Sequence, residues 1–459
     1  MIDLIAKIGR VTAMECTAIP VIGAGVALRV VSNRSAFSVL ILWLLMCCAG
    51  TAVSAEQDAA AARSVQDAAQ SAPQGEATEA SGSGEGRAQY PAFLANSFVN
   101  VNVGYIGYPF SALQLEPGHR VESIRVPHPS VRAVLFGRHF GRHLSGQISY
   151  MRPVEYVKYQ NVDGAENSRS VWMHLGTLTL IARAPLGERL SIFGEGGVAV
   201  TSRRGFADGA DIVVKDAQFW SPLMGAGLEY RASQSWDLVS SVTYIPRNDE
   251  HRQPHSVFAS AGFRINLRPL SADRVKETQD TGRVVPENLI QIGYATNALG
   301  YGANNVLSKQ VPIFWRGKVE VQQSVVNVQY HRNVFYTKRI FALDFGASYA
   351  EWKSNRNGES FRTFSVFPVM RFTVARSTLA DFYLLYSIAG PTYISRTTID
   401  DLDTGSHFTF QDFMGFGVFM GARRQINAEI NLNHYSNGNI QLRNAGVKVP
   451  LTFKVGYGF

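Results

Sequence analysis

The sequence predicts an all-β protein built as two tandem antiparallel eight-stranded barrels. Three observations lead to this prediction. The 459-residue chain contains 41 glycines and 11% aromatic residues, and its body consists of short segments in which apolar and polar residues alternate. Two polar breaks, at residues 56–89 and 271–286, set off two blocks of similar length. The chain ends on an alternating segment whose last residue, Phe459, is aromatic.

The N-terminal segment predicts export. Arg34 precedes an apolar stretch over residues 36–46, and Val53-Ser54-Ala55 supplies a small-x-small cleavage site. These are the features of a secretory signal peptide. We therefore expect residues 1–55 to be a signal or targeting segment, with a membrane anchor as the alternative. Residues 56–89 are rich in Ala, Gln, Glu, Ser and Gly and are expected to be a disordered linker.

Composition excludes several classes of function. The formal charge of +8 comes from basic residues scattered among the expected loops, whereas a nucleic-acid binder usually clusters them. Cys16, Cys47 and Cys48 are the only cysteines, so thiol catalysis and disulfides are excluded downstream. The ten histidines are dispersed, and neither an HExxH motif nor a calcium loop occurs. We expect no metal, no cofactor and no nucleic-acid partner.

Residues 90–270 are expected to form the first barrel. Its clearest strand lies at 256–267, where apolar and polar residues alternate over a length that can span a membrane. Strands are expected to start near Phe98, Val131, Leu144, Val171, Leu190, Phe219, Trp236 and Ser256.

Residues 287–459 are expected to form the second barrel. In its last strand every second residue is apolar up to Phe459. This ending resembles the assembly signal of bacterial outer-membrane barrels, which implies a Gram-negative outer membrane and the barrel assembly machinery as partners. Strands are expected to start near Leu289, Val319, Ile340, Phe361, Asp381, Phe408, Gln425 and Val449.

Alternation alone does not separate a membrane barrel from a soluble sheet, because both have one apolar face. The secretory segment, the terminal aromatic residue and the two even-stranded sets favour the membrane. Lipid requires a closed barrel, since an open sheet edge leaves unpaired backbone groups. One larger barrel and a periplasmic sandwich are the alternatives. Eight-stranded barrels are filled by side chains, so neither block is expected to be a general porin.

The strand over 425–436 carries a histidine and a serine on its lipid face. Its polar row is Gln425, Asn427, Glu429, Asn431 and Asn433, and its apolar row is Ile426, Ala428, Ile430 and Leu432. His434 and Ser436 continue the apolar row. With both termini in the periplasm, this strand runs outward and the pair lies near its outer end, at the lipopolysaccharide leaflet. Polar residues on a lipid face usually mark function; the alternative is that they are belt residues.

The segments around this pair resemble a known family. His434-Tyr435-Ser436-Asn437, then Asn444-Ala445-Gly446-Val447 and a final alternating strand, are similar to the PagL family of outer-membrane lipid A 3-O-deacylases. The preceding segment 408–417 is similar to the strand before the active site in that family. The likeness covers roughly residues 287–459. The first block is similar to a generic OmpA/OmpW-type barrel.

The resemblance implies a serine esterase that acts on lipid A of lipopolysaccharide. Ser436 would be the nucleophile and His434 the general base, with Asn437 and Asn444 at the oxyanion site or positioning the reacting groups. A hydroxyl needs a neighbouring base to become nucleophilic, and an i, i+2 spacing on a strand places both side chains on one face.

The sequence departs from the family at the acid of the triad. The family's Glu falls about twelve residues after the Ser, where this chain has Lys448. Asp412 interrupts the lipid-facing row of the preceding strand and is a substitute acid. The tight connection near Ala422–Arg424 predicts that paired residue numbers sum to 846 or 848, which places Asp412 opposite His434 or Ser436. A solvated charge at the barrel rim is the alternative role for Asp412. Glu429 belongs to the polar row of its strand, so its side chain is expected to point into the lumen.

Two functions follow from these residues. The first is deacylation of lipid A by the Ser-His pair, with Arg443, Lys448 and Arg332 as possible contacts for lipid A phosphates. The second is a structural or binding outer-membrane protein that keeps the barrel fold of the family but has lost its activity. Lys448 favours the second function, whereas Asp412 and the two asparagines favour the first.

Overall fold

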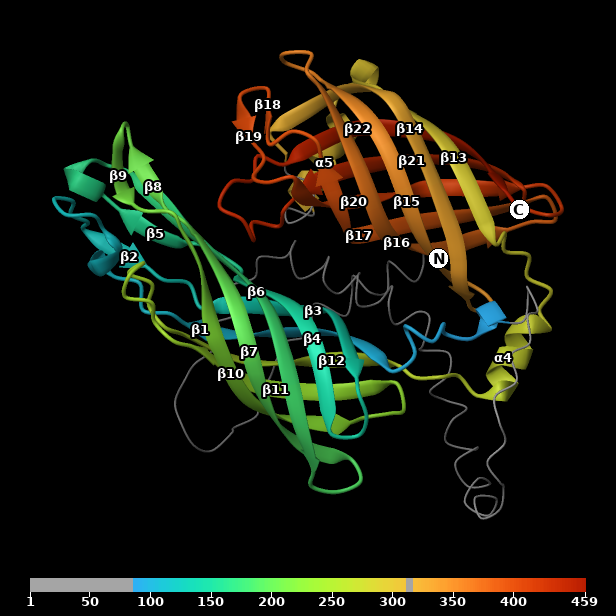
Figure 1. Cartoon of the computed structure of the whole chain (residues 1–459), viewed down its shortest axis with the longest axis horizontal. Helices are drawn as coiled ribbons and strands as arrows, with labels where there is room; N and C mark the ends of the chain where they lie inside the picture. Colours follow the sequence, from blue (N-terminus) through green and yellow to red (C-terminus); the bar gives the residue numbers. More distant parts are fainter. Residues whose placement is uncertain (1–85, 311–316) are drawn as a thin grey trace, which may run out of the picture.

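The computed structural model describes residues 86–310 and 317–459, which form two closed antiparallel eight-stranded barrels (Figure 1). The predicted fold class is therefore confirmed. The expected signal segment, its three cysteines and nearly all of the expected linker at 56–89 lie outside the described residues.

The first barrel is an up-and-down barrel that closes between β6 and β7 through the order β6-β4-β3-β1-β12-β11-β10-β7. Its strands are β1 (Ser97–Gly107), β3 (Pro129–His139), β4 (Leu144–Pro153), β6 (Ser168–Pro185), β7 (Leu190–Arg204), β10 (Ala217–Arg231), β11 (Trp236–Ile245) and β12 (Ser256–Leu267). Short strands β2 (Ser123–Arg125) and β5 (Val157–Gln160) extend the sheet beyond β6, and β8 (Phe206–Asp208) pairs with β9 (Asp211–Val214).

The second barrel closes between β13 and β22. Its strands are β13 (Asn288–Ala295), β14 (Val319–Tyr336), β15 (Phe341–Ser354), β16 (Ser360–Arg376), β17 (Ala380–Ile394), β20 (Phe408–Met420), β21 (Ile426–Ser436) and β22 (Val447–Gly458). A small hairpin, β18 (Thr398–Ile399) and β19 (Leu402–Asp403), lies between β17 and β20. The sixteen barrel strands begin within three residues of the positions that alternation predicts.

In the part of the chain that the structure describes, two short α-helices lie outside the barrel walls. Helix α4 (Ala272–Gln279) lies in the segment between the barrels, and α5 (Gly302–Gln310) lies in the connection from β13 to β14. Neither of these helices, within the described ranges, is long and apolar enough to cross a membrane.

Polar side chains fill the lumen of each barrel. In the second barrel Glu429 and Lys454 form a fully buried ion pair with 3.2 Å between Oε1 and Nζ. In the first barrel the equivalent role falls to Arg132 and Glu195, at 2.5 Å. These pairs are satisfied by further hydrogen bonds, such as the one Tyr383 donates to Glu429. A filled interior is what an eight-stranded barrel allows.

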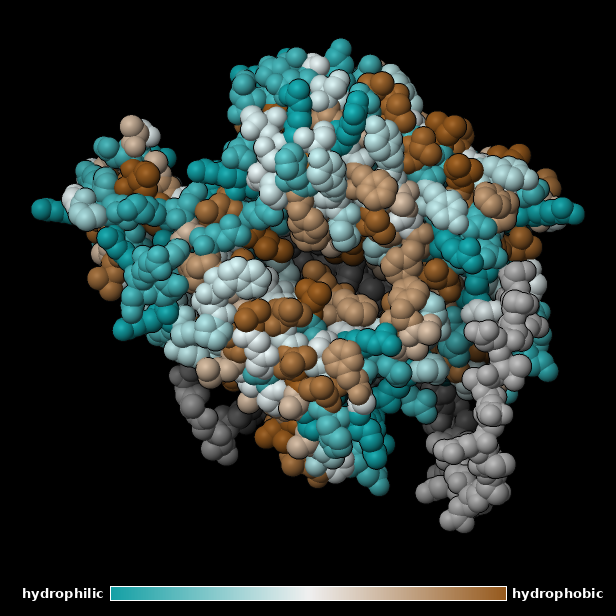
Figure 2. All heavy atoms as spheres, viewed as in Figure 1, coloured by the Kyte–Doolittle hydropathy of each residue, from teal (hydrophilic) through white to brown (hydrophobic). Residues whose placement is uncertain are grey.

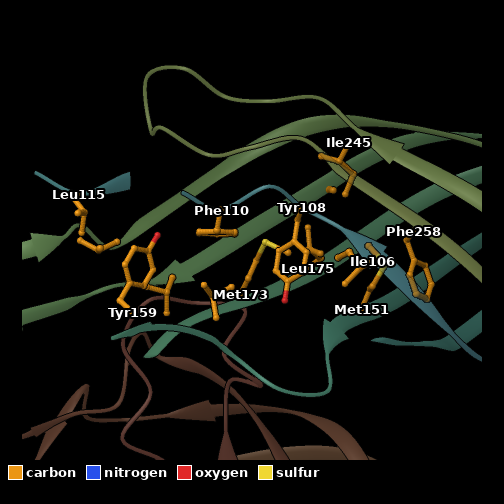
Figure 3. Packing of buried hydrophobic residues seen from close by; sticks show 14 of the residues in the cluster. Ile106, Tyr108, Phe110, Leu115, Met151, Tyr159, Met173, Leu175, Ile245 and Phe258 are labelled. Carbon is orange, nitrogen blue, oxygen red and sulfur yellow. The ribbon is translucent and has the colours of Figure 1, made fainter. Parts of the chain in front are cut away.

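The outer walls carry apolar side chains, which Figure 2 shows as brown patches on both barrels. Examples on the second barrel, whose side chains are 49–67% exposed, are Ile292, Phe364, Phe382, Phe416 and Val455. Such exposure is typical of a lipid-facing row. The first barrel also holds an apolar cluster at one end, built from residues such as Tyr108, Met173 and Phe258 (Figure 3).

The two ends of the second barrel are distinct. At the end we call the base, Asn288 and Phe459 exchange backbone hydrogen bonds. The described N-terminal segment and α4 also lie at this end, where Arg87 donates to the side chain of Asn333. Strand β21 begins at the base, with Ile426 opposite Tyr457, and ends at the opposite end, which we call the rim.

Candidate functional site

The hairpin of β20 and β21 brings the candidate residues together. Gly421 and Arg424 both have positive φ, at 86° and 56°, and form a tight turn at the base. Paired residues on the two strands therefore sum to 846, so Asp412 lies directly opposite His434 and Phe410 opposite Ser436. This is one of the two registers that the sequence predicts.

His434 points away from the lumen. Its neighbours Asn433 and Tyr435 point inward. Asn433 donates to Thr452 at 3.1 Å, and Tyr435 belongs to an apolar cluster inside the rim of the second barrel, together with Trp352 and Phe361. Side chains alternate along a strand, so His434 and Ser436 share the outer face. Ser436 is the last residue of β21, about 7 Å along the strand from His434.

The carboxylate of Asp412 faces His434. Its Oδ2 lies 3.7 Å from His434 Nδ1, and its Oδ1 accepts a hydrogen bond of 2.7 Å from the backbone N–H of Ala389. Asp412 is 6% exposed and His434 3% exposed, so Asp412 is not a solvated rim charge. The distance of 3.7 Å is longer than a hydrogen bond, so the two groups form a close charged contact rather than a hydrogen bond.

An irregularity in β17 supplies the hydrogen bond to Asp412. The pairing of β17 with β20 shifts between Ser387 and Gly390, and Ala389 has the left-handed φ of 53°. An extra residue of this kind bends a strand and re-aims its backbone groups. Here the bulge turns the Ala389 N–H toward the outer face, where it fixes one oxygen of the carboxylate.

The position of the family's acid holds a lysine that is already paired. Lys448 lies opposite His434 on the other side, in β22. Its Nζ is 2.7 Å from Glu320 Oε1 and lies over the Tyr301 ring at 4.7 Å. The outer face therefore carries a row of four ionisable side chains on neighbouring strands: Asp412, His434, Lys448 and Glu320.

The two candidate arginines lie far apart. Arg332 is at the base, opposite Asn288, and pairs with Glu287 at 2.8 Å. It is therefore remote from Ser436. Arg443 is at the rim and largely exposed, with its Nη1 3.7 Å from Asp216 of the first barrel. Only Arg443 lies in the loop that follows Ser436.

Asn437 and Asn444 shape the loop after Ser436. The side-chain amide of Asn437 donates to the carbonyl oxygens of Arg443, at 2.6 Å, and Thr404, at 3.4 Å. Asn444 Oδ1 accepts from the Asn437 backbone N–H at 3.2 Å, and its amide donates to Asn439. Because both amide hydrogens of Asn437 are engaged, the geometry fits a positioning role rather than direct donation to an oxyanion.

Sequence reasoning missed three parts of this site: the bulge at Ala389, the partner Glu320 of Lys448, and the first-barrel residue Asp216. A signal for the bulge exists, because the outward parity of β17 changes between Tyr386 and Tyr393. Glu429 lies in the lumen as its parity predicts, bonded to Lys454. Within residues 86–310 and 317–459, no group of three His, Cys, Asp or Glu side chains is arranged to hold a metal ion.

Comparisons with known families match the two barrels separately. The model of the family described as lipid A 3-O-deacylase (PagL) matches residues 322–457, and that of the OmpA-like transmembrane domain matches residues 145–274. Both matches confirm the resemblances drawn from the sequence. No curated protein matches the chain.

Several solved structures are similar to parts of this chain at low identity. The outer-membrane enzyme PagL is 15% identical and covers 37% of this chain and 99% of its own, with a TM-score of 0.27. The N-terminal barrel domain of Pseudomonas aeruginosa OprF is 14% identical over 38% of this chain and 98% of its own, with a TM-score of 0.25. The chain therefore has two β-barrels, the first similar to the OmpA-like transmembrane domain and the second similar to the lipid A 3-O-deacylase (PagL) family, and these similarities support an outer-membrane location.

Proposed function

We propose that this protein is a serine esterase of the outer membrane that removes the ester-linked acyl chain at the 3-O position of lipid A in lipopolysaccharide. The observation that carries the proposal is the Asp412–His434 pair on the outer face of the barrel, with Ser436 two residues after His434 on the same face of β21. The family match over residues 322–457 supplies the reaction class.

The chemistry follows from the order of the three side chains. Because Nδ1 of His434 faces Asp412, Nε2 is the nitrogen that takes the proton of Ser436. The Ser436 Oγ then attacks the ester carbonyl, and His434 passes the proton to the departing sugar oxygen. Water hydrolyses the resulting acyl-enzyme, again with His434 as base. Asp412 orients the imidazole and stabilises its protonated form.

The outer face suits a membrane-embedded substrate. Phe410 and Met414 flank Asp412 on the same face of β20, and Leu432 precedes His434 on β21. Acyl chains of a lipid can lie along such an apolar wall, while the sugar backbone lies at the height of the rim. In this proposal the rim faces the outer leaflet, because the first strand begins and the last strand ends at the base, on the periplasmic side.

A second candidate function is that of a barrel without enzymatic activity. The presence of Lys448 at the family's acid position favours this candidate. Mass spectrometry of lipid A from cells expressing the protein separates the two. Deacylation predicts the loss of one hydroxyacyl chain with the wild-type protein and no loss with Ser436→Ala at equal outer-membrane amounts. An unchanged spectrum in several lipid A backgrounds would establish the inactive barrel instead.

A further inference from the structure

The loop that follows Ser436 rests on the outer wall of the first barrel. This loop, residues 437–446, which we call the Ser436 loop, connects β21 to β22. We propose that the first barrel is a positioning part of the esterase site, with Tyr150, Ser202 and Gln218 as the positioning residues. The inference rests on the proposed function, because it assigns to the first barrel a role in the same reaction.

Three hydrogen bonds tie the Ser436 loop to three strands of the first barrel. Tyr150 of β4 donates its hydroxyl to the carbonyl oxygen of Gly438 at 2.9 Å. Gln218 of β10 donates to the carbonyl oxygen of Ile440 at 2.9 Å, and Ser202 of β7 donates to the same oxygen. All three bonds go to backbone carbonyls, so they fix the path of the loop rather than one side chain.

The first-barrel wall is shaped to receive the loop. Gly176 of β6 lies between the donors, and a Cβ at this position would be 3.6 Å from the Ile440 side chain. Ser202 under the loop is 3% exposed. Outward residues next to the contact, Leu178 of β6 and Trp220 of β10, are 58% and 70% exposed. Figure 3 shows the red-brown ribbon of the second barrel beside this part of the first barrel.

The Tyr150 donor is itself oriented. Its hydroxyl also contacts His174 Nδ1 on β6, so the hydroxyl hydrogen is directed to Gly438 when the imidazole nitrogen carries its own hydrogen. Arg443 adds a charged contact to Asp216 at the far side of the loop, 3.7 Å away. The wall therefore contacts the loop at both its start and its end.

The loop needs such support because its own geometry is unusual. Gly438, Asn439 and Gly446 all have positive φ, between 57° and 66°, and the loop begins one residue after the nucleophile. A displacement of about 1 Å at a reacting group costs up to about 100-fold in rate. Backbone carbonyls that are left without a partner are also costly, and here the first barrel supplies the partners.

The first test uses the full-length protein in lipid A-containing vesicles. The variant Tyr150→Phe/Ser202→Ala/Gln218→Ala is expected to lower kcat about tenfold or more with little change in KM. The matched control is Tyr244→Phe/Ser240→Ala on β11, whose outward side chains lie away from the loop, and it should keep the wild-type kcat. A triple variant with wild-type kcat, while Ser436→Ala is inactive, would overturn the positioning role.

The second test locks the loop. No cysteine occurs among the described residues, and Cys16, Cys47 and Cys48 are replaced by serine for this test, so Gly176→Cys/Ile440→Cys creates one defined pair. Added to the triple variant, the oxidised disulfide is expected to restore kcat by about tenfold over the reduced form of the same protein. A restoration that reverses with reductant distinguishes positioning from loss of folding; no difference between the two forms would contradict positioning.

The disulfide also separates this inference from the proposed function. Its yield is measured by peptide mass spectrometry and needs no activity. High yield with an inactive wild-type protein would retain the docked loop but refute both esterase proposals. A low yield in folded protein under oxidising conditions would show that the loop does not rest on this wall, whatever the activity of Ser436.

Discussion

Asp412 and His434 lie directly opposite each other on β20 and β21, with 3.7 Å between Oδ2 and Nδ1. The same row continues through Lys448, which pairs with Glu320 on the far side of the barrel closure. In the proposed site the acid, Asp412, therefore lies on the opposite flank of His434 from Lys448, which occupies the family's acid position. On this proposal a lysine at that position is compatible with activity.

The reversal predicts that the acid can be moved back. In an Asp412→Asn background, the exchange Lys448→Glu with Glu320→Lys places a carboxylate opposite His434 on β22, at a Cβ separation of about 5 Å. We expect the rate of acyl release from lipid A to recover at least about tenfold over Asp412→Asn alone. The same exchange in a Ser436→Ala background should stay inactive, and no recovery in folded protein would show that side of His434 to be unsuitable for an acid.

The bulge in β17 predicts opposite effects of two substitutions at Ala389. Its φ of 53° suits glycine, so Ala389→Gly should keep the rate within about twofold and the free energy of unfolding within about 1 kcal/mol. Ala389→Pro removes the N–H that Asp412 accepts and cannot adopt this φ. It should lower the rate at least about tenfold.

Heat-dependent gel mobility, which reports barrel closure, checks that both Ala389 variants are folded. Equal rates for the glycine and proline variants in folded protein would remove the Ala389 hydrogen bond from the mechanism.

The buried pair Glu429–Lys454 predicts an effect on stability without an effect on catalysis. Glu429→Ala leaves Lys454 charged in the lumen and should cost about 3–5 kcal/mol of unfolding free energy, measured by urea unfolding in vesicles. The double variant Glu429→Met/Lys454→Met removes both charges and should lie close to wild type. If Glu429→Ala instead abolished turnover per folded molecule, Glu429 would have to act in catalysis.

Much of the fold follows from local sequence patterns. Alternation over segments such as 256–267 locates the strands, and the tight turn between Gly421 and Arg424 determines which residues of β20 and β21 face each other. Because both are properties of neighbouring residues, the sequence predicts Asp412 opposite His434 or Ser436, and the structure has the register that places it opposite His434. The short strands β2, β5, β8 and β9 were not, since they lie in connections without a clear alternating pattern.

The rest of the site depends on contacts between distant residues. Lys448 meets Glu320 only because β14 and β22 pair in parallel near the closure of the barrel. Gly438 and Ile440 meet Tyr150, Ser202 and Gln218 only because the two barrels lie against each other. Neither contact has a local signature, so a single sequence does not reveal them.

The central claim is that Asp412 acts as the acid of the site, and the direct measurement is the rate of acyl release from lipid A by purified wild-type and Asp412→Asn proteins. The two proteins must show the same heat-dependent gel mobility, and their free energies of unfolding must agree within about 1 kcal/mol. The claim predicts that Asp412→Asn is about 10³- to 10⁴-fold slower, because the imidazole loses its orientation and charge partner. Equal rates for the two proteins would contradict it.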